Sequence, residues 1–362
     1  MIYLLARVLQ PVFSPANLFR YITFRAALAA GFAILILMLF GRPVVRMINR
    51  LALGEEIYEE LPERHRKKTG TPSMGGVLIV SAIIISLLLF ADLTNPYVLC
   101  SLVILVGMGI LGFADDYVKL RKHKRGIKKR WKFLAQAVLA LGVSLYLYFF
   151  PESQTLRSAT NVLFLKNYVI QLGLFYVLLS GFVIVASGNA VNFADGLDGL
   201  AIGLLAIVAG AYAVLAYAGG NVKIADYLNV LYVAKAGEMA VVSASVVGAG
   251  LGFLWFNTHP ASIFMGDTGA LPLGALMGFI AVVVKQEILL AIIGGVFVLE
   301  VVSVILQVIW FHASKGKKRL FKMTPLHHHF ELKGWAESKI VVRFWIWGIL
   351  FALAGLATLK VR

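Results

Sequence analysis

The sequence predicts an all-α polytopic membrane protein with about ten transmembrane helices. The chain of 362 residues is 60% hydrophobic and only 14% charged, which is too apolar for a soluble domain of this length. Apolar runs recur along the whole chain, and most are long enough to cross the roughly 30 Å hydrocarbon core of a bilayer. Cys100 is the single cysteine, which excludes an internal disulfide and a cysteine-based metal cluster.

Taken in order, residues 1–21 are expected to lie at the membrane interface, because Pro11 and Pro15 interrupt them and no small-residue cleavage site follows. The ten predicted spans are Ile22–Phe40, Met74–Ala91, Tyr97–Ala114, Trp131–Phe150, Tyr168–Ser187, Leu200–Ala218, Met239–Phe256, Gly269–Val284, Ile288–Phe311 and Ile340–Leu359. The eighth span is short, so an alternative count demotes it to a re-entrant segment or merges it with a neighbour. We expect residues 1–362 to form a single integral-membrane domain.

Lysines and arginines alternate in phase with these spans and thereby predict the orientation. They concentrate in the loops after spans one, three and nine, and positive loops mark the cytoplasmic face. The predicted cytoplasmic loops are 41–73, 115–130, 188–199, 257–268 and 312–339, and both termini lie outside. Topology retention and attraction to anionic lipid headgroups are sufficient reasons for the basic runs, although a phosphate-bearing substrate stays open. Nucleic-acid binding is disfavoured because the net charge of +16 lies in loops held against a bilayer.

Unusual polar motifs gather on the cytoplasmic side of the predicted bundle. They occur in five loops, with the sequences "KKTGTPSMGG", "GFADDYVK", "SGNAVNFADGLDGLA", "FNTHPASIFMGDTGALP" and "KMTPLHHHFELKGW". Five polar loops that converge on one membrane face predict an active site there.

Two pairs of carboxylates stand out in these loops. Asp115 and Asp116 end span three, where one can point into the bundle and the other into a cytosolic cleft; the alternative is a pair of solvated helix-end charges. Asp195 and Asp198 are three residues apart in "DGLDG", so a helical start would present both on one face. An N-cap role is the alternative for either.

Asp267 lies between two glycines in "FMGDTG", where its carboxylate stands clear of bulky neighbours. Mg²⁺ is commonly held by one or two carboxylates together with water and substrate phosphates, although an ordinary turn aspartate would look the same. His327, His328 and His329 are adjacent, which does not fit the i, i+4 spacing of a zinc-binding helix. Loop histidines could bind phosphate or sugar and move protons near neutral pH, or they could simply be solvated.

Together, carboxylates, lysines, asparagines and histidines on one face predict phosphoryl transfer, in which positioning and charge neutralisation supply most of the catalysis. No GxxxxGK[ST] motif is present, which argues against a P-loop nucleotide hydrolase.

The joint occurrence of "GTPSMGG", "GFADDYVK", "GNAVNFADGLDGLA", "GAGLGFLWFN", "FMGDTG" and "LHHHFELKGW" resembles the phospho-N-acetylmuramoyl-pentapeptide transferases of the polyprenyl-phosphate N-acetylhexosamine-1-phosphate transferase superfamily. The resemblance implies Mg²⁺-dependent transfer of phospho-MurNAc-pentapeptide from UDP-MurNAc-pentapeptide to undecaprenyl phosphate in the bacterial inner membrane, giving lipid I and UMP. It implies periplasmic termini, an active site on the cytoplasmic face and contact with membrane lipid but not nucleic acid. A homodimer is left open.

The resemblance also implies residue roles. Asp267 would ligate Mg²⁺, Asp115 would act on the attacking lipid phosphate or its proton, and Asp116 would support the lipid-phosphate or metal side. His327 would be the most critical histidine, assisted by His328 and His329. The substrate-binding set implied by the motifs is Lys68, Ser73, Lys119, Lys132, Asn189, Asn192, Asp195, Asp198, Asn257 and Phe264, the last as a uracil stacker.

Three positions depart from the usual family pattern: Ser73 replaces Thr, Phe193–Ala194 replaces Leu-Thr, and Ala270 replaces Ser. None deletes a charge, so altered substrate affinity is expected rather than lost chemistry. Two other functions stay open. Glu300 inside span nine motivates an ion-coupled transporter, because an ionisable residue at membrane depth is a functional candidate, and a sister transferase would use UDP-N-acetylglucosamine.

Overall fold

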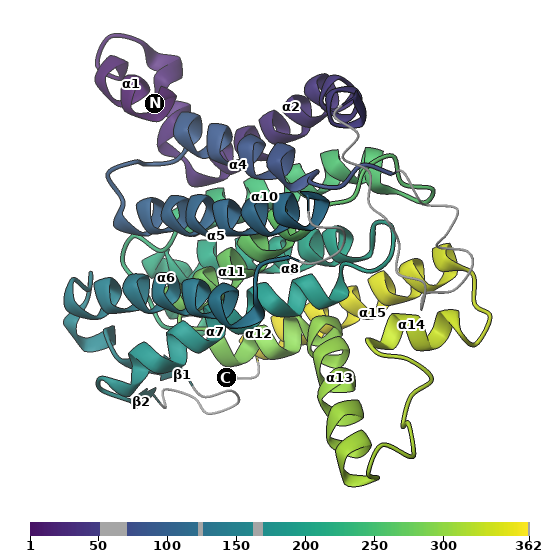
Figure 1. Cartoon of the computed structure of the whole chain (residues 1–362). Helices are drawn as coiled ribbons and strands as arrows, with labels where there is room; N and C mark the ends of the chain where they lie inside the picture. Colours follow the sequence, from purple (N-terminus) through teal and green to yellow (C-terminus); the bar gives the residue numbers. More distant parts are fainter. Residues whose placement is uncertain (51–70, 122–125, 162–168, 361–362) are drawn as a thin grey trace.

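The structure is a bundle of helices with almost no strand (Figure 1). The computed structural model describes residues 1–50, 71–121, 126–161 and 169–360. Within these ranges, eight helices are long and apolar enough to cross a membrane: α2 (Ile22–Arg50), α5 (Pro96–Arg121), α6 (Lys129–Phe149), α7 (Phe175–Ala194), α8 (Leu200–Gly219), α10 (Glu238–Asn257), α13 (Gly295–Ala313) and α15 (Glu337–Ala357). Two shorter apolar helices are α4 (Gly76–Phe90) and α11 (Asp267–Val283). The predicted all-α polytopic class is therefore confirmed.

Each predicted span has a helical counterpart in the described part of the chain, but two spans differ in detail. The fifth begins at Phe175 rather than Tyr168, because the antiparallel strands β1 (Ala159–Asn161) and β2 (Val169–Gln171) precede it. The ninth is two helices, α12 (Glu287–Ile293) and α13, which meet at Gly294. These corrections matter because the break lets α13 leave the bundle, as Figure 1 shows.

Several helices run further into the predicted cytoplasmic loops than expected. Helix α2 continues to Arg50, α5 to Arg121 and α7 to Ala194, and the short helix α14 (Leu326–Glu331) lies inside the last loop. Asp115 and Asp116 are therefore inside α5 rather than at its end, which corrects the sequence prediction. Lys68 and most of the first loop lie outside the described residues.

Helix α11 is the centre of the bundle, since all of its residues are buried and it packs against both α5 and α7. A helix that is apolar all round is expected in such a position. Two glycines bring its first turn close to its neighbours. A Cβ on Gly112 of α5 would collide with the Asp267 carbonyl, and one on Gly76 of α4 would collide with Gly269. Close packing at glycine thus places the start of α11 beside the aspartates of α5.

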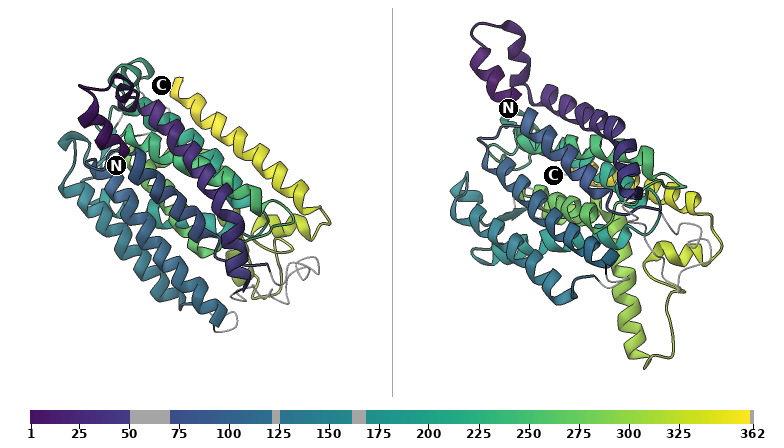
Figure 2. Two further views of the ribbon diagram at one scale, coloured as in Figure 1. Left: turned by 90° about the horizontal axis from the view of Figure 1, so that it is seen from above. Right: turned by 45° about the horizontal axis from the view of Figure 1, so that its top comes forward.

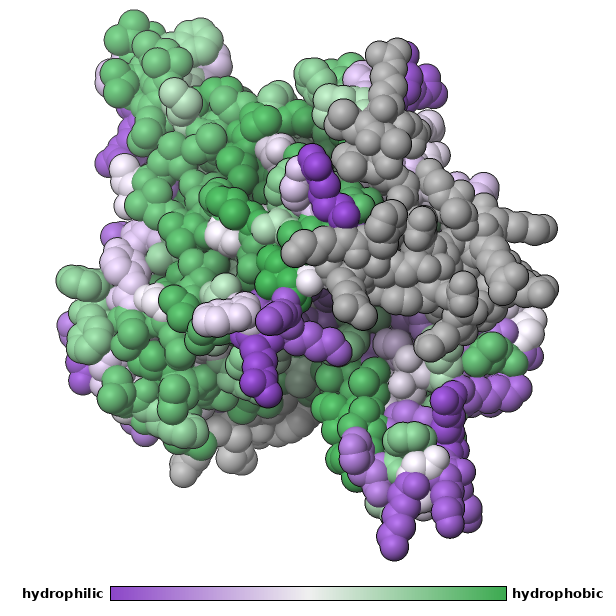
Figure 3. All heavy atoms as spheres, viewed as in Figure 1, coloured by the Kyte–Doolittle hydropathy of each residue, from purple (hydrophilic) through white to green (hydrophobic). Residues whose placement is uncertain are grey.

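The helices run side by side and both ends of the chain lie at the same end of the bundle (Figure 2), as an even number of spans requires. The remaining elements are short: α1 (Ile2–Leu9), η1 (Ser14–Arg20), η2 (Gln154–Leu156), α9 (Val222–Leu228) and η3 (Thr358–Lys360). The face in Figure 3 is largely apolar over the helices, with hydrophilic side chains at the far end of α13 and the loop after it. Such a surface fits a multi-pass membrane protein.

Candidate active site

Asp116 holds the first turn of α11. Its Oδ2 accepts hydrogen bonds from the Thr268 backbone N–H at 2.9 Å and the Thr268 hydroxyl at 2.6 Å. Its Oδ1 accepts one from the Asp267 N–H at 3.3 Å. The first N–H groups of a helix lack partners within that helix and favour negative charge nearby. Asp116 therefore caps α11 from another helix and positions Asp267.

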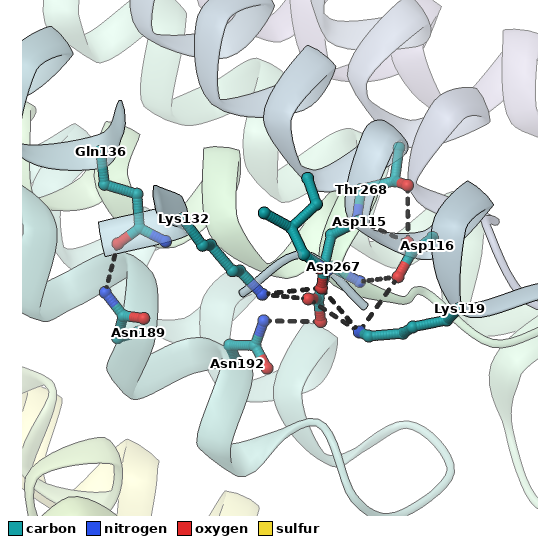
Figure 4. A network of polar contacts seen from close by, with 10 residues as sticks. Asp115, Asp116, Lys119, Lys132, Gln136, Asn189, Asn192, Asp267 and Thr268 are labelled. Atoms are coloured by element: carbon teal, nitrogen blue, oxygen red, sulfur yellow. Dashed lines mark hydrogen bonds and ion pairs between the residues drawn. The ribbon is translucent and has the colours of Figure 1, made fainter. Parts of the chain in front are cut away.

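Asp267 lies where two lysines and an asparagine converge (Figure 4). Its Oδ2 is 2.9 Å from the Lys119 Nζ and also contacts the Lys132 Nζ, while its Oδ1 accepts a hydrogen bond from Asn192 at 2.7 Å. Asp115 lies beside them, with its Oδ2 3.0 Å from the Nζ of each lysine. We call Asp115, Asp116, Asp267, Lys119 and Lys132 the charged cluster.

The charged cluster could hold a divalent metal ion. Asp115, Asp116 and Asp267 are only 2%, 4% and 8% exposed, and each offers an oxygen within 4.8 Å of the others. Hard carboxylate oxygens in such a group suit Mg²⁺. Three carboxylates and two ammonium groups leave one formal negative charge, which a cation would offset. The donor set therefore fits the metal implied by the motifs.

The segment that contains Ser73 runs along the loop before Asp267. Phe264 donates its N–H to the Pro72 carbonyl and accepts the Gly75 N–H, and Gly76 donates to Met265. This pairing places buried Ser73 against Gly266, whose φ of +70° is a conformation that favours glycine. Ser73 therefore lies beside Gly266, next to Asp116 of the charged cluster, and the same pairing fixes the backbone of Phe264.

Asn189 and Asn192 were predicted in the loop 188–199 but lie on α7, and they have different partners. Asn192 reaches the charged cluster, whereas Asn189 donates to Gln136 of α6 at 2.6 Å and to the Val185 carbonyl. Asn257, at the end of α10, accepts the Gly199 N–H at 3.0 Å and donates to the Ile263 carbonyl at 2.8 Å. Its amide thus joins the 195–199 turn to the loop before α11.

The expectation that Asp195 and Asp198 begin a helix is wrong. Helix α7 ends at Ala194, Asp195 caps its C-terminus, and α8 begins only at Leu200 after Gly199 with φ +79°. Because both aspartates lie in the intervening turn, neither is an N-cap.

Asp198 belongs to a second polar group, which we call the loop clasp: Asp198, His259 and Glu337. The buried Asp198 carboxylate accepts the Ala261 N–H at 3.1 Å, and its Oδ2 lies 3.0 Å from the His259 Nδ1. Glu337, the first residue of α15, accepts the Asp198 N–H at 2.8 Å and lies 3.3 Å from the same His259 nitrogen. The loop clasp therefore ties the 195–199 turn, the loop before α11 and the start of α15 together.

The three adjacent histidines turn to three different partners. His327 is fully buried with its Nδ1 3.3 Å from the Glu300 Oε1, although the alignment is not that of a hydrogen bond. The Nδ1 of His328 lies 2.7 Å from the Oε2 of Glu331, and the Nδ1 of His329 accepts a hydrogen bond from the Lys322 backbone N–H at 3.1 Å. Partial burial, together with Lys333 and Lys322 nearby, lowers the pKa of His329.

His327 nevertheless connects to the predicted site. A Cβ on Gly196 would collide with its ring, so the histidine packs directly on the 195–199 turn. Glu300, which motivated the transporter alternative, is the ionisable neighbour of this histidine rather than an isolated group in a transport path.

Sequence reasoning missed Thr268, Gln136, His259 and Glu337. Thr268 would have been the easiest of these to predict from the sequence, because it directly follows Asp267 and lies in the first turn of a helix. The partners of Gln136, His259 and Glu337 are 53 or more residues away along the chain, so no local spacing could indicate them.

Comparison with known families agrees with this site. Residues 97–285 match glycosyl transferase family 4, a range that covers more than half of the chain and includes Asp115, Asp116, Lys119, Lys132 and Asp267. Residues 68–80 match the first signature of the phospho-N-acetylmuramoyl-pentapeptide transferases, and Ser73 lies within it. The chain therefore belongs to glycosyl transferase family 4, and it carries the first signature of the phospho-N-acetylmuramoyl-pentapeptide transferases.

Proposed function

We propose that this protein transfers phospho-MurNAc-pentapeptide from UDP-MurNAc-pentapeptide to undecaprenyl phosphate at the cytoplasmic face of the bacterial inner membrane, with Mg²⁺ as cofactor. An oxygen of the lipid phosphate attacks the phosphorus bonded to the sugar. A new P–O–P link forms, the bond to UMP breaks, and UMP leaves with its electron pair. The products are lipid I and UMP.

The observation that carries the proposal is the charged cluster at the end of an apolar bundle. A lipid phosphate is confined to the headgroup plane, and a sugar nucleotide arrives from water, so their reaction needs polar residues at this boundary. Lys119 and Lys132 would neutralise phosphate charge, and phosphoryl transfer depends mainly on such positioning and neutralisation. Bound Mg²⁺ would add further neutralisation of the pyrophosphate, and Asp267 with Asp115 would hold it.

Asp115 would orient the attacking phosphate rather than act as a strong base. A phosphate monoester has a second pKa of about 6, so it is largely dianionic at neutral pH and already nucleophilic. Asp116 would act through Asp267, because its oxygens are engaged by the first turn of α11. We assign Phe264, with the nearby 195–199 turn, to the uridine side.

An apolar groove along α7 suits the lipid tail. It has a volume of about 430 Å³ and is lined by residues of α7, α12 and α13, including Phe182, Ala190 and Val301. Ala190 lies two residues before Asn192, which contacts Asp267, so α7 connects the groove to the proposed reaction centre.

The test is product formation by the purified protein in detergent. With UDP-MurNAc-pentapeptide, undecaprenyl phosphate and Mg²⁺ we expect UMP and a lipid product, and we expect neither when Mg²⁺ is omitted or Asp267 is changed to Asn. Activity with UDP-N-acetylglucosamine instead would assign the sister reaction. A folded protein that is inactive with both sugar nucleotides would reject the proposal, and substrate uptake into sealed vesicles would then favour transport.

A further inference from the structure

We propose that Lys119 and Lys132 compete with the divalent cation for Asp267. On this view their ammonium groups bind the carboxylate oxygen that the cation needs, and cation binding releases them toward substrate phosphate. The inference rests on the proposed function, in which Asp267 ligates the metal.

The contacts within the charged cluster leave few oxygens for a cation. The Asp267 Oδ1 accepts a hydrogen bond from Asn192, and both oxygens of Asp116 are engaged by the backbone or hydroxyl groups of α11. The Asp115 Oδ1 accepts the Ile127 N–H at 2.7 Å. The Oδ2 atoms of Asp115 and Asp267 remain, and both lysines contact both of these atoms.

A divalent cation bound to the Asp267 Oδ2 would lie close to the positively charged ammonium groups of Lys119 and Lys132. Mg²⁺ binds oxygen at about 2.0–2.1 Å and demands near-octahedral geometry, so an ammonium on the same oxygen would be a repulsive neighbour and would obstruct part of the coordination sphere. At least one lysine would therefore turn away when the cation binds. Repulsion between like charges is strong where burial reduces solvent screening.

Both lysines can move between the aspartates and a substrate phosphate. Their side chains are 33% and 18% exposed, so each already reaches solvent, and a lysine combines a flexible four-carbon stem with a compact charge. Each would therefore balance an aspartate before the cation binds and a phosphate afterwards. The same residues would keep the buried carboxylates neutralised and later help to bind the sugar nucleotide.

The test measures Mn²⁺ affinity directly, from the electron paramagnetic resonance signal of free Mn²⁺ in detergent without substrates. We expect Lys132→Gln to bind Mn²⁺ about tenfold more tightly than the parent protein, within the usual range of coupling between sites. Lys129→Gln is the matched control, since Lys129 is an exposed lysine one turn earlier on α6. It removes the same charge outside the charged cluster and should change the affinity by less than about twofold.

The outcomes separate this inference from the proposed function. If the parent protein binds no Mn²⁺, the metal assignment at Asp267 is wrong. If the parent binds Mn²⁺ but Lys132→Gln binds it equally or more weakly, or matches the Lys129→Gln control, competition is rejected.

A second measurement uses the parent protein and covers the case in which Lys132→Gln does not fold. Lysine acylation is followed by mass spectrometry with and without Mn²⁺, with Lys129 as internal reference. We expect Mn²⁺ to accelerate acylation of Lys132 or Lys119 relative to Lys129. Unchanged or slower acylation of both would overturn the inference.

Discussion

At the residue scale, Asp115 and Asp116 show how two adjacent carboxylates acquire different roles. Successive residues of a helix point in different directions, so Asp115 faces Lys119 and Lys132 while Asp116 faces the start of α11. Both oxygens of Asp116 consequently cap α11. The Oδ2 of Asp115 contacts the two lysines of the charged cluster. Under the proposed function, we expect removal of Asp115 to disturb the charge balance around Lys119 and Lys132, and removal of Asp116 to displace Asp267.

Thr268→Val tests the capping role of Asp116. The variant loses the 2.6 Å hydroxyl hydrogen bond to Asp116 but retains a side chain of similar shape. We expect a loss of about 1–2 kcal/mol in unfolding free energy and a reduced kcat, because Asp267 is less firmly held. Thermal unfolding in detergent and steady-state kinetics measure the two effects. Thr268→Ser keeps the hydroxyl and should be close to the parent; equal losses in both variants would argue against the cap.

Ala270→Ser tests whether the departure at this position matters for catalysis. Ala270 is 1% exposed and lies one turn into α11, with its N–H bonded to the Gly266 carbonyl. A serine hydroxyl can bond to a carbonyl of the preceding turn, so we expect turnover to stay within about tenfold, or about 1.4 kcal/mol in the barrier. A larger gain in kcat/KM would show that alanine compromises the enzyme there.

At the element scale, the apolar pattern predicted the spanning helices well because burial in a bilayer requires long apolar runs with internally satisfied backbones. Hydropathy did not predict the helix break at Gly294 or the strands near Thr160. The apolar character of the chain does not change at Gly294, and the two strands are only three residues long each. Clustering of motifs also indicated the charged cluster. The cap on α11 and the loop clasp depend on close approach of helices at glycine and on distant partners, which local patterns do not encode.

The loop clasp leads to a prediction for Glu337. Glu337→Ala removes the acceptor for the Asp198 N–H and the carboxylate near His259. The loop between α10 and α11, which carries His259 and Phe264, should then be held less firmly. We expect KM for the sugar nucleotide to rise about three- to tenfold, equivalent to roughly one lost hydrogen bond, with a smaller change in kcat.

Glu337→Gln is the conservative comparison, because its amide oxygen can still accept the Asp198 N–H. Its KM should lie between those of the parent and Glu337→Ala. A change confined to kcat, or no change in either variant, would contradict a positioning role for the loop clasp.

At the scale of the whole molecule, polar networks hold both ends of the apolar bundle. The charged cluster and the loop clasp join the helices at the end where α11 begins. At the other end, the turn between α11 and α12 is fixed by Lys285, which donates to the Tyr176 hydroxyl at 2.8 Å, and by Glu287, which accepts from Thr160 of β1 at 3.2 Å. Glu287 also contacts the Tyr176 hydroxyl. This second network holds one end of the apolar groove, because Glu287 lines it.

Lys285 makes the stability of this far end depend on pH. Burial lowers its pKa to about 8, against the opposing effect of Glu287, whereas an unfolded lysine titrates near 10.4. Between these two values the unfolded chain binds more protons than the folded protein, so stability rises with pH. The full difference corresponds to on the order of 3 kcal/mol. Below pH 8 both states are protonated and this gain is absent.

The comparison that checks this effect is thermal unfolding of the parent protein and Lys285→Met in detergent at pH 8 and pH 10. We expect the parent to gain several degrees in Tm relative to the variant over this interval. The comparison uses only the change in Tm between pH 8 and pH 10. The absolute Tm is not compared, because Lys285→Met also leaves the buried Glu287 without a nearby cation and should lower Tm at both pH values. Parallel slopes would mean that the Lys285 ammonium is solvated, and the network would then stabilise the turn without any proton linkage.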